Sequence, residues 1–251
     1  MIIGREIAGD HGQIWLAARQ RVRHLLTGRT PAEMARPVPA MPGLTVHDVL
    51  SGLVATSAAA LDGDIHATYA APGGGRAPDA RTDAELLSAW DAQAEGVAAL
   101  VRDDPRAGRL LIDLVTHEHD LRGALDCPGA RADDAVAVAV ELLAREFAGR
   151  LRAADAPALR LTCEQWGYET APPPCHAILV ADRFELFRGF TGRRSAAEVR
   201  RWMWSDDPAP YLPYLSDSGS LRATDLDEPD PDVPPEYAER LRTRSWREPV
   251  G

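Results

Sequence analysis

The sequence predicts an α+β fold in two parts: a helical bundle over residues 1–155 and a small α/β domain over residues 156–251. Throughout the first part, apolar residues recur three and four positions apart, as they do in amphipathic helices packed in a bundle. The pattern then changes, because residues 158–163 (ALRLTC) alternate as a strand does and residues 175–182 (CHAILVAD) form a short apolar run. The boundary falls near Asp155.

Capping boxes mark the expected helix starts. In this motif a Thr or Ser and an acid three residues later each accept a hydrogen bond from a backbone N–H of the first turn. Thr45 with Asp48 and Thr82 with Glu85 fit the motif, and apolar residues at helical spacing follow each pair. Together with three other periodic segments, the expected helices cover residues 14–26, 45–62, 82–102, 104–125 and 132–153.

The second part is expected to hold the two strands already named, with residues 166–170 continuing the first strand's edge after a turn at Gly167. Residues 183–190 fit either a helical turn or a strand. Ser195 and Glu198 form a further capping box, which predicts one more helix. After that helix Asp and Pro dominate, so an irregular tail is expected from residue 205 onward.

Two connectors interrupt the helical part. Residues 30–43 contain four prolines and are expected to be irregular. Residues 70–78 include the tetrapeptide GGGR and are expected to form a flexible loop. A phosphate-binding loop is excluded there, because the Lys-Ser/Thr that should follow the glycines and the strand that should precede them are both missing.

Composition narrows the class of protein. The formal net charge of −10 argues against nucleic acid and anionic membranes as partners, and every basic residue is arginine. No apolar run approaches the roughly 20 residues of a spanning helix, and the first residues lack the pattern of a signal peptide. Cys127, Cys163 and Cys175 are too widely spaced for a zinc knuckle or a disulfide framework. These features predict a cytoplasmic protein.

Residues 110–125 (LLIDLVTHEHDLRGAL) carry two histidines and three acids in an otherwise apolar helical run. Asp113 and His117 are four residues apart and therefore share a helix face. They could hold zinc or another divalent metal if a facing helix supplied a third ligand. The alternative is that Asp113 only hydrogen-bonds His117. Glu118 and Arg122 are expected to form a surface ion pair, worth only a few tenths of a kcal/mol.

Three stretches of the chain carry a resemblance to a known family. They are residues 41–55 (MPGLTVHDVLSGLVA), residues 113–125 (DLVTHEHDLRGAL), and residues 184–195 (FELFRGFTGRRS) followed by Trp202 and residues 205–212 (SDDPAPYL). The first is similar to a PGWTvxDvlxHL helix, the second to a metal-binding helix and the third to a GRRS…W…DP.pYL signature. This combination resembles the DinB-like superfamily, in particular the actinobacterial mycothiol-dependent maleylpyruvate isomerase-like proteins.

The resemblance implies an N-terminal DinB-like four-helix bundle that holds a divalent metal, usually zinc. Asp113 and His117 fall on two of the three ligand positions. The third position, the histidine of the family's HL pair, is Gly52 in this chain. His47 lies five residues earlier, about 140° round the helix, and is interpreted as a surface histidine rather than a replacement. His66, among other histidines, is a possible donor.

The resemblance further implies a metal- and mycothiol-dependent isomerase or S-transferase acting on a small electrophilic molecule. A metal beside this low-molecular-weight thiol would favour the thiolate, which attacks the electrophile. Arg193, and less clearly Arg188, would bind an anionic group of the thiol or the substrate, or else only solvate a loop. Because of Gly52, two alternatives stay open: a metal-free member in which Asp113 and His117 act as acid and base on a bound small molecule, and a non-enzymatic ligand-binding module.

Overall fold

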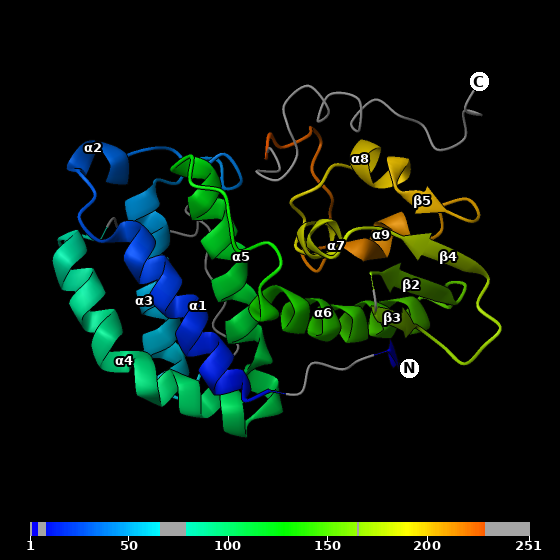
Figure 1. Ribbon diagram of the computed structural model, residues 1–251, viewed down its shortest axis with the longest axis horizontal. Helices are drawn as coiled ribbons and strands as arrows, with labels where there is room; N and C mark the ends of the chain where they lie inside the picture. Colours follow the sequence, from blue (N-terminus) through cyan, green and yellow to red (C-terminus); the bar gives the residue numbers. More distant parts are fainter. Residues whose placement is uncertain (1, 5–8, 66–78, 165, 229–251) are drawn as a thin grey trace. The chain divides into compact units, whose positions relative to one another are not determined.

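The computed structural model describes residues 2–4, 9–65, 79–164 and 166–228. The chain mixes helices with one sheet, in agreement with the predicted α+β class (Figure 1). It divides into two compact units, Ala8–Cys127 and Met1–Ile7 with Pro128–Gly251, which we call the helical unit and the sheet unit. In the described ranges, no helix has both the length and the apolar character needed to cross a membrane. The loop expected over residues 70–78 and the last part of the expected tail lie outside these ranges.

Long helices of the helical unit pack around one apolar core. α1 contacts both α4 and α5, and α3 contacts the same two helices. The core includes Trp15, Leu50, Leu86, Trp90 and Leu111, each at most 2% exposed. In chain order the elements are α1 (His11–Leu26), α2 (Pro31–Met34), α3 (Val46–Leu61), α4 (Asp83–Asp103), the 3-10 turn η1 (Pro105–Ala107) and α5 (Gly108–Ala124).

The predicted capping boxes are present. Thr45 accepts from the N–H of Asp48 (3.2 Å) and caps α3, and Thr82 with Glu85 caps α4 in the same way. A further capping box was missed, because Thr30 and Glu33 start α2 inside the segment expected to be irregular. The spacing of three between Thr30 and Glu33 is visible in the sequence, but the four prolines of residues 30–43 favoured an irregular segment. Pro is nevertheless well accommodated in a first helical turn.

The sheet of the second unit has the strand order β1-β3-β2-β4-β5. β2 and β4 run parallel, and the other neighbouring pairs run antiparallel. The turn between β2 and β3 lies at Glu164, where φ is +36°, while Gly167 lies within β3 opposite Thr162, so the predicted turn at Gly167 was wrong. The strands are β1 (Ile2–Gly4), β2 (Leu159–Cys163), β3 (Trp166–Glu169), β4 (Ala177–Val180) and β5 (Met203–Trp204).

The helices of the sheet unit are α6 (Asp134–Ala153), α7 (Arg183–Phe190), α8 (Ala196–Arg201) and α9 (Leu212–Leu215). α6 packs against α7 and α9, and the rings of Phe147 and Phe190 lie 5.5 Å apart. The compact units therefore divide after Cys127, whereas the sequence placed α6 in the first part and the boundary at residues 155–156. Helical periodicity identifies the apolar face of α6, but not the element that buries it.

Candidate functional site

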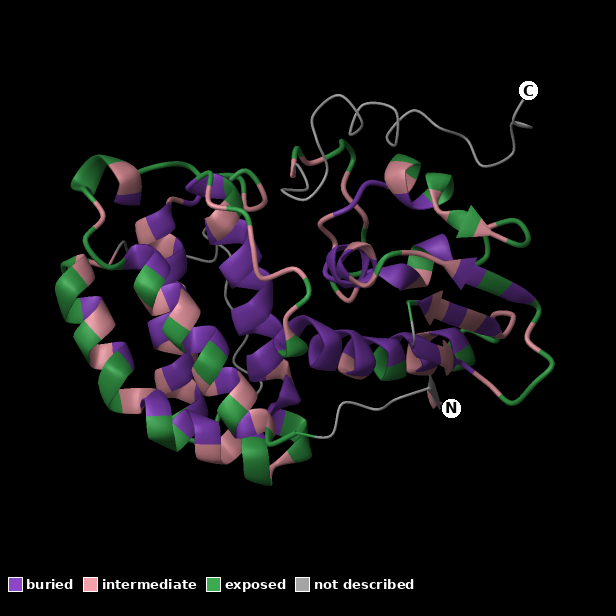
Figure 2. Ribbon diagram, viewed as in Figure 1, coloured by how far each residue is buried: buried purple, intermediate pink, exposed green. Residues whose placement is uncertain are grey.

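The candidate site lies on α5, whose residues are buried almost all round (Figure 2). Asp113, His117 and Asp120 are among its buried polar residues, at 9%, 5% and 1% exposed. Burying a polar or charged group costs free energy unless it is hydrogen-bonded, so a core helix with this composition needs partners for its polar groups.

Two of these partners come from α5 itself. Arg109 donates from Nε to Oδ1 of Asp113 over 2.9 Å, four residues along the helix. His117 and Asp120 are three residues apart, with 3.3 Å between Nδ1 and Oδ2. A carboxylate that accepts the Nδ1 hydrogen fixes the tautomer in which Nε2 carries the lone pair. The His117–Asp120 pair therefore has the arrangement of a base held by an acid.

Asp113 and His117 line a small cavity inside the helical unit, with a volume of about 20 Å³, which is room for roughly one water molecule. The Nε1–H of Trp90 donates to Ser57 Oγ over 3.1 Å, and this hydroxyl donates to the carbonyl of Leu53 over 2.8 Å. These bonds fix the Trp90 ring in the wall. The lining is mostly apolar and consists of Trp15, Leu53, Thr56, Ser57, Trp90, Val97, Leu110, Asp113, Leu114 and His117.

The residues of this cavity do not fit the three-ligand metal site that the resemblance implies. α3 contributes Leu53, Thr56 and Ser57 to the wall, and none of these is a carboxylate, imidazole or thiol. Among the residues the structure describes, no three His, Cys, Asp or Glu side chains come together as a group that could hold a metal ion. Zinc sites in proteins use at least three such ligands. The cavity wall therefore lacks the donor set of a zinc site.

The two α3 positions considered for the third ligand lie outside the cavity wall. Gly52 is half-buried and is not a lining residue. His47 is bound to the start of α4, with Nδ1 2.7 Å from Asp83 Oδ1 and Nε2 3.3 Å from the carbonyl of Asp79. Burial lowers the pKa of His47, but the hydrogen bonds to Asp83 and to the Asp79 carbonyl and the charges of Asp83 and Asp48 together leave this pKa above its ordinary value. His66 lies outside the described residues.

Glu118 is not the surface residue that the sequence predicted. Its side chain is fully buried, at 0% exposed. Arg122 donates to it from Nη2 over 2.9 Å, as its position four residues later suggested. Arg21 of α1 also donates two hydrogen bonds of 2.8 Å, one to each carboxylate oxygen. The expectation of a weak exposed ion pair was wrong, because α1 covers this face of α5.

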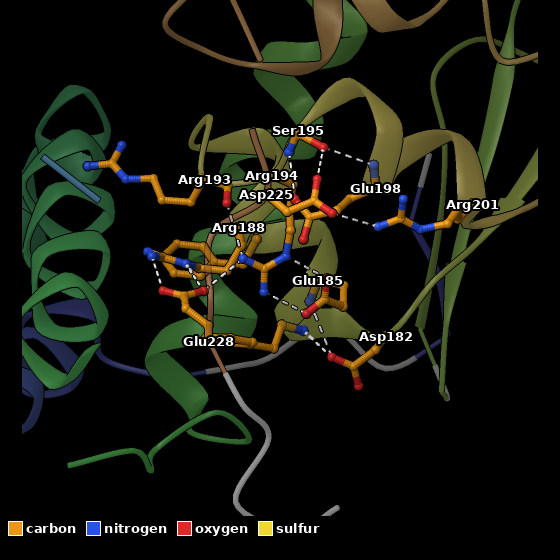
Figure 3. Close-up of polar contacts among 12 residues, drawn as sticks. Asp182, Glu185, Arg188, Arg193, Arg194, Ser195, Glu198, Arg201, Asp225 and Glu228 are labelled. Atoms are coloured by element: carbon orange, nitrogen blue, oxygen red, sulfur yellow. Dashed lines mark hydrogen bonds and ion pairs between the residues drawn. The ribbon is translucent and has the colours of Figure 1, made fainter. Parts of the chain in front are cut away.

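Arg188 and Arg193, predicted to bind an anion, belong to the sheet unit. Arg188 is fully buried on α7 and is bound by the carboxylate of Glu228. Arg193 is partly exposed and donates from Nη1 to the carbonyl of Thr191 over 2.6 Å, and its side chain points away from the other arginines (Figure 3). Gly192 permits this tight turn, since its φ is +73° and a Cβ would lie 2.9 Å from Ser216 Oγ.

Sequence reasoning missed two features of these sites. Asp120 was given no role, although its spacing of three from His117 suggests that the two side chains meet. Glu228 gave no signal, because it lies 40 residues from Arg188 in an irregular segment. Comparison with protein-family models, with curated proteins and with solved structures found no match.

Proposed function

We propose that the helical unit is a divergent DinB-like four-helix bundle and that its cavity binds a small molecule, on which His117 acts as a general base. The packing of α1, α3, α4 and α5 around one core supports the bundle. The cavity lined by Asp113 and His117 lies within these four helices. Its mostly apolar wall with a few polar groups is the usual character of a small-molecule site.

The pairing of His117 with Asp120 is the observation that carries the proposed chemistry. The buried carboxylate orients the imidazole and stabilises the imidazolium that forms when Nε2 accepts a proton. The proton would come from an acidic C–H or O–H of the bound molecule. His117 would return this proton to another atom of the bound molecule in a rearrangement, and Asp113, held as a carboxylate by Arg109, would add a negative charge beside the imidazolium.

The wall suggests the class of the ligand. Two indole rings, from Trp15 and Trp90, favour an aromatic or otherwise flat apolar body. The hydroxyl of Thr56 offers a hydrogen bond to one polar group, whereas that of Ser57 is already bound to Trp90 and Leu53. We therefore propose a small ligand with an apolar body and one hydroxyl or similarly acidic group, which enters when the side chains of the wall move apart.

A metal- and mycothiol-dependent isomerase or S-transferase is the second candidate. The observation that favours it is that Asp113 and His117, two of the three family ligand positions, line the same cavity. It requires a third ligand that the cavity wall does not supply, such as a thiol that enters with the substrate.

Binding of phenol, followed by ligand-observed NMR, tests the proposed site. The full chain is expected to bind phenol, and His117→Leu is expected to weaken binding by about tenfold, as loss of one buried hydrogen bond would. His24→Leu is the matched control, because His24 is exposed on α1. Unchanged affinity in His117→Leu would favour a passive ligand-binding module, and no binding to the unaltered chain would refute the site.

Metal analysis of the purified chain separates the two candidates. The metal-free proposal predicts that zinc is far below one equivalent and that a chelator leaves phenol binding unchanged. Near-stoichiometric zinc that is lost in an Asp113→Ala, His117→Ala double variant would overturn the proposal in favour of the metal-dependent reaction.

A further inference from the structure

The last described segment of the sheet unit, residues 222–228, runs back over α7 and α8, and we call it the strap. Its first residue donates a backbone hydrogen bond to the carbonyl of Arg194 over 3.1 Å. Asp225, in the middle, accepts hydrogen bonds from Ser195 Oγ and, over 3.0 Å, from Arg201 Nη2. The strap is irregular in conformation, so these side-chain and main-chain contacts hold it.

Glu228 at the end of the strap inserts its carboxylate between two buried guanidinium groups (Figure 3). Arg188 donates to Oε2 from Nε over 3.0 Å and to Oε1 from Nη2, which is the two-pronged geometry typical of Arg–carboxylate recognition. Arg194 adds a third donor, from Nη1 to Oε2 over 2.7 Å. Arg188 and Arg194 are 0% and 3% exposed, so this carboxylate is bound in a desolvated site.

Groups other than the strap hold the surrounding arginines in position. Arg194 is gripped by Glu185 of α7 through two hydrogen bonds of 2.7 Å. Burial favours the neutral form of Glu185, but the hydrogen bond and charge of Arg194, with the charges of Arg131 and Arg188, together lower the pKa of Glu185, so the carboxylate stays charged. Arg131 lies 4.5 Å above the ring of Phe184 and donates to the main-chain carbonyl of Glu228. Glu185 therefore holds Arg194 in place independently of the strap.

Charge balance makes a carboxylate necessary at this position. Arg131, Arg188 and Arg194 surround the site, and Glu185 neutralises one of them. Buried guanidinium groups without an anion are destabilising, because burial removes their hydration. Glu228 supplies the needed charge from an irregular segment rather than from a helix, so an external anion of the same shape could replace it.

We propose that Arg188 and Arg194 form a carboxylate-binding site that Glu228 occupies as an internal ligand, and that a small carboxylate compound binds there when it displaces the strap. The chemistry that would recognise the external ligand is that seen for Glu228: a planar carboxylate that accepts three charge-assisted hydrogen bonds. Because Glu228 is tethered, it competes with an external carboxylate at an effective concentration in the millimolar range. Glu228 therefore occupies the site most of the time in the unaltered chain.

Glu228→Gln tests the proposal in the full chain, because it removes the competing charge and keeps the side-chain shape. Calorimetric titration with succinate is expected to give an affinity at least about tenfold higher than for the unaltered chain, given millimolar competition. Glu146→Gln is the matched control, since it makes the same change of net charge at an exposed pair with Arg150. Asp225→Asn, which loosens the strap elsewhere, should give an intermediate gain.

Three results would overturn the proposal. If Glu228→Gln gains no more affinity for succinate than Glu146→Gln does, competition by Glu228 is excluded. Inorganic phosphate binding the variant more tightly than succinate would identify a general anion site instead of a carboxylate site. If the gain in succinate affinity persists when Arg188→Gln is added to Glu228→Gln, succinate binds at a different site.

Proteolysis of the unaltered chain gives an independent readout that does not depend on the folding of a variant. Trypsin cleaves after arginine, and Arg222 lies at the start of the strap. Succinate is expected to accelerate cleavage after Arg222, relative to sodium chloride at equal ionic strength, because displacement of Glu228 frees the strap. Equal cleavage rates in the two salts would contradict the proposal.

Discussion

α5 of the helical unit and the strap of the sheet unit both carry buried ionisable side chains, but pairs between near neighbours occur on α5, whereas the strap supplies a distant partner. On α5 of the helical unit, Arg109 pairs with Asp113 and His117 with Asp120, four and three residues apart. In the sheet unit, Arg188 binds an acid 40 residues away. Local pairs are set by helix geometry alone. A long-range pair depends on how firmly the segment that carries the partner is docked.

Glu118 combines the two arrangements, since it binds Arg122 on its own helix and Arg21 on α1, 97 residues earlier in the chain. It lies on a long helix and is held there by the helix backbone. Glu228, by contrast, lies on the irregular strap. The comparison predicts that an acid fixed on a helix cannot escape to water when its pairing is lost, whereas an acid on the strap can.

The largest loss of stability is expected from Glu118→Gln. The variant removes the charge of a fully buried carboxylate from two partly buried guanidinium groups, and breaking such a pair costs about 3 kcal/mol. Urea unfolding of the full chain measures this loss. Asp103→Asn, at an exposed pair with Arg102, is the control and should change stability by no more than about 0.5 kcal/mol. A similar loss in both variants would mean that burial does not distinguish them.

A smaller loss is expected from Glu228→Gln, about 1.5 kcal/mol, which is the low end for hydrogen bonds to charged groups. The strap can release the altered side chain to water, and Arg194 keeps its pairing with Glu185. The same urea titration measures it. A loss equal to that of Glu118→Gln would break the proposed difference between helix-bound and strap-bound acids.

Removal of an N-cap hydroxyl is expected to have different costs in stability in the two units. Thr82→Ala removes one N-cap hydrogen bond at α4 and should cost about 1 kcal/mol. Ser195→Ala should cost more, because Ser195 caps α8 and also donates to Asp225 of the strap. Thermal unfolding of these variants, with Thr82→Ser and Ser195→Thr as hydroxyl-retaining controls, provides the ranking. Equal costs would show that the strap adds nothing at Ser195.

The smallest expected effect is a pH dependence at His47. Because the pKa of His47 is higher in the folded chain than its ordinary value of about 6.5, its contribution is fully present below that value. This contribution is lost as pH rises through the folded pKa. The unaltered chain should therefore lose more stability between about pH 6 and pH 9 than Asp83→Asn does, as urea midpoints would report. The control His24→Gln should follow the unaltered chain, and parallel profiles for all three proteins would contradict the assignment.

Local features were predictable where neighbouring residues cause them. The capping boxes at Thr45, Thr82 and Ser195 start helices as expected, because their partners lie three residues away. Asp113 and His117 share a face and line one cavity, which follows from their spacing of four. The choice between helix and strand for residues 183–190 was left open, because a segment of eight residues is short enough to fit both periodicities.

Features that depend on a distant neighbour were not predictable. Glu118 is buried because α1 covers it, so the predicted surface ion pair was wrong. α6 belongs to the sheet unit because it packs against α7, so the predicted domain boundary lies after α6 rather than before it. The two-residue β5 has no periodicity of its own and forms only because β4 pairs with it.

The sequence by itself determined the α+β class, the helix starts and the placing of Asp113 and His117 on one helix face, because backbone hydrogen bonding and helical periodicity act over three or four residues. Only the tertiary structure decided which side chains those residues meet. It gave α3 a wall of Leu53, Thr56 and Ser57 where a metal ligand was sought, and it brought Glu228 to Arg188. Burial and long-range charge pairing depend on how elements pack, and packing is a property of the whole folded chain.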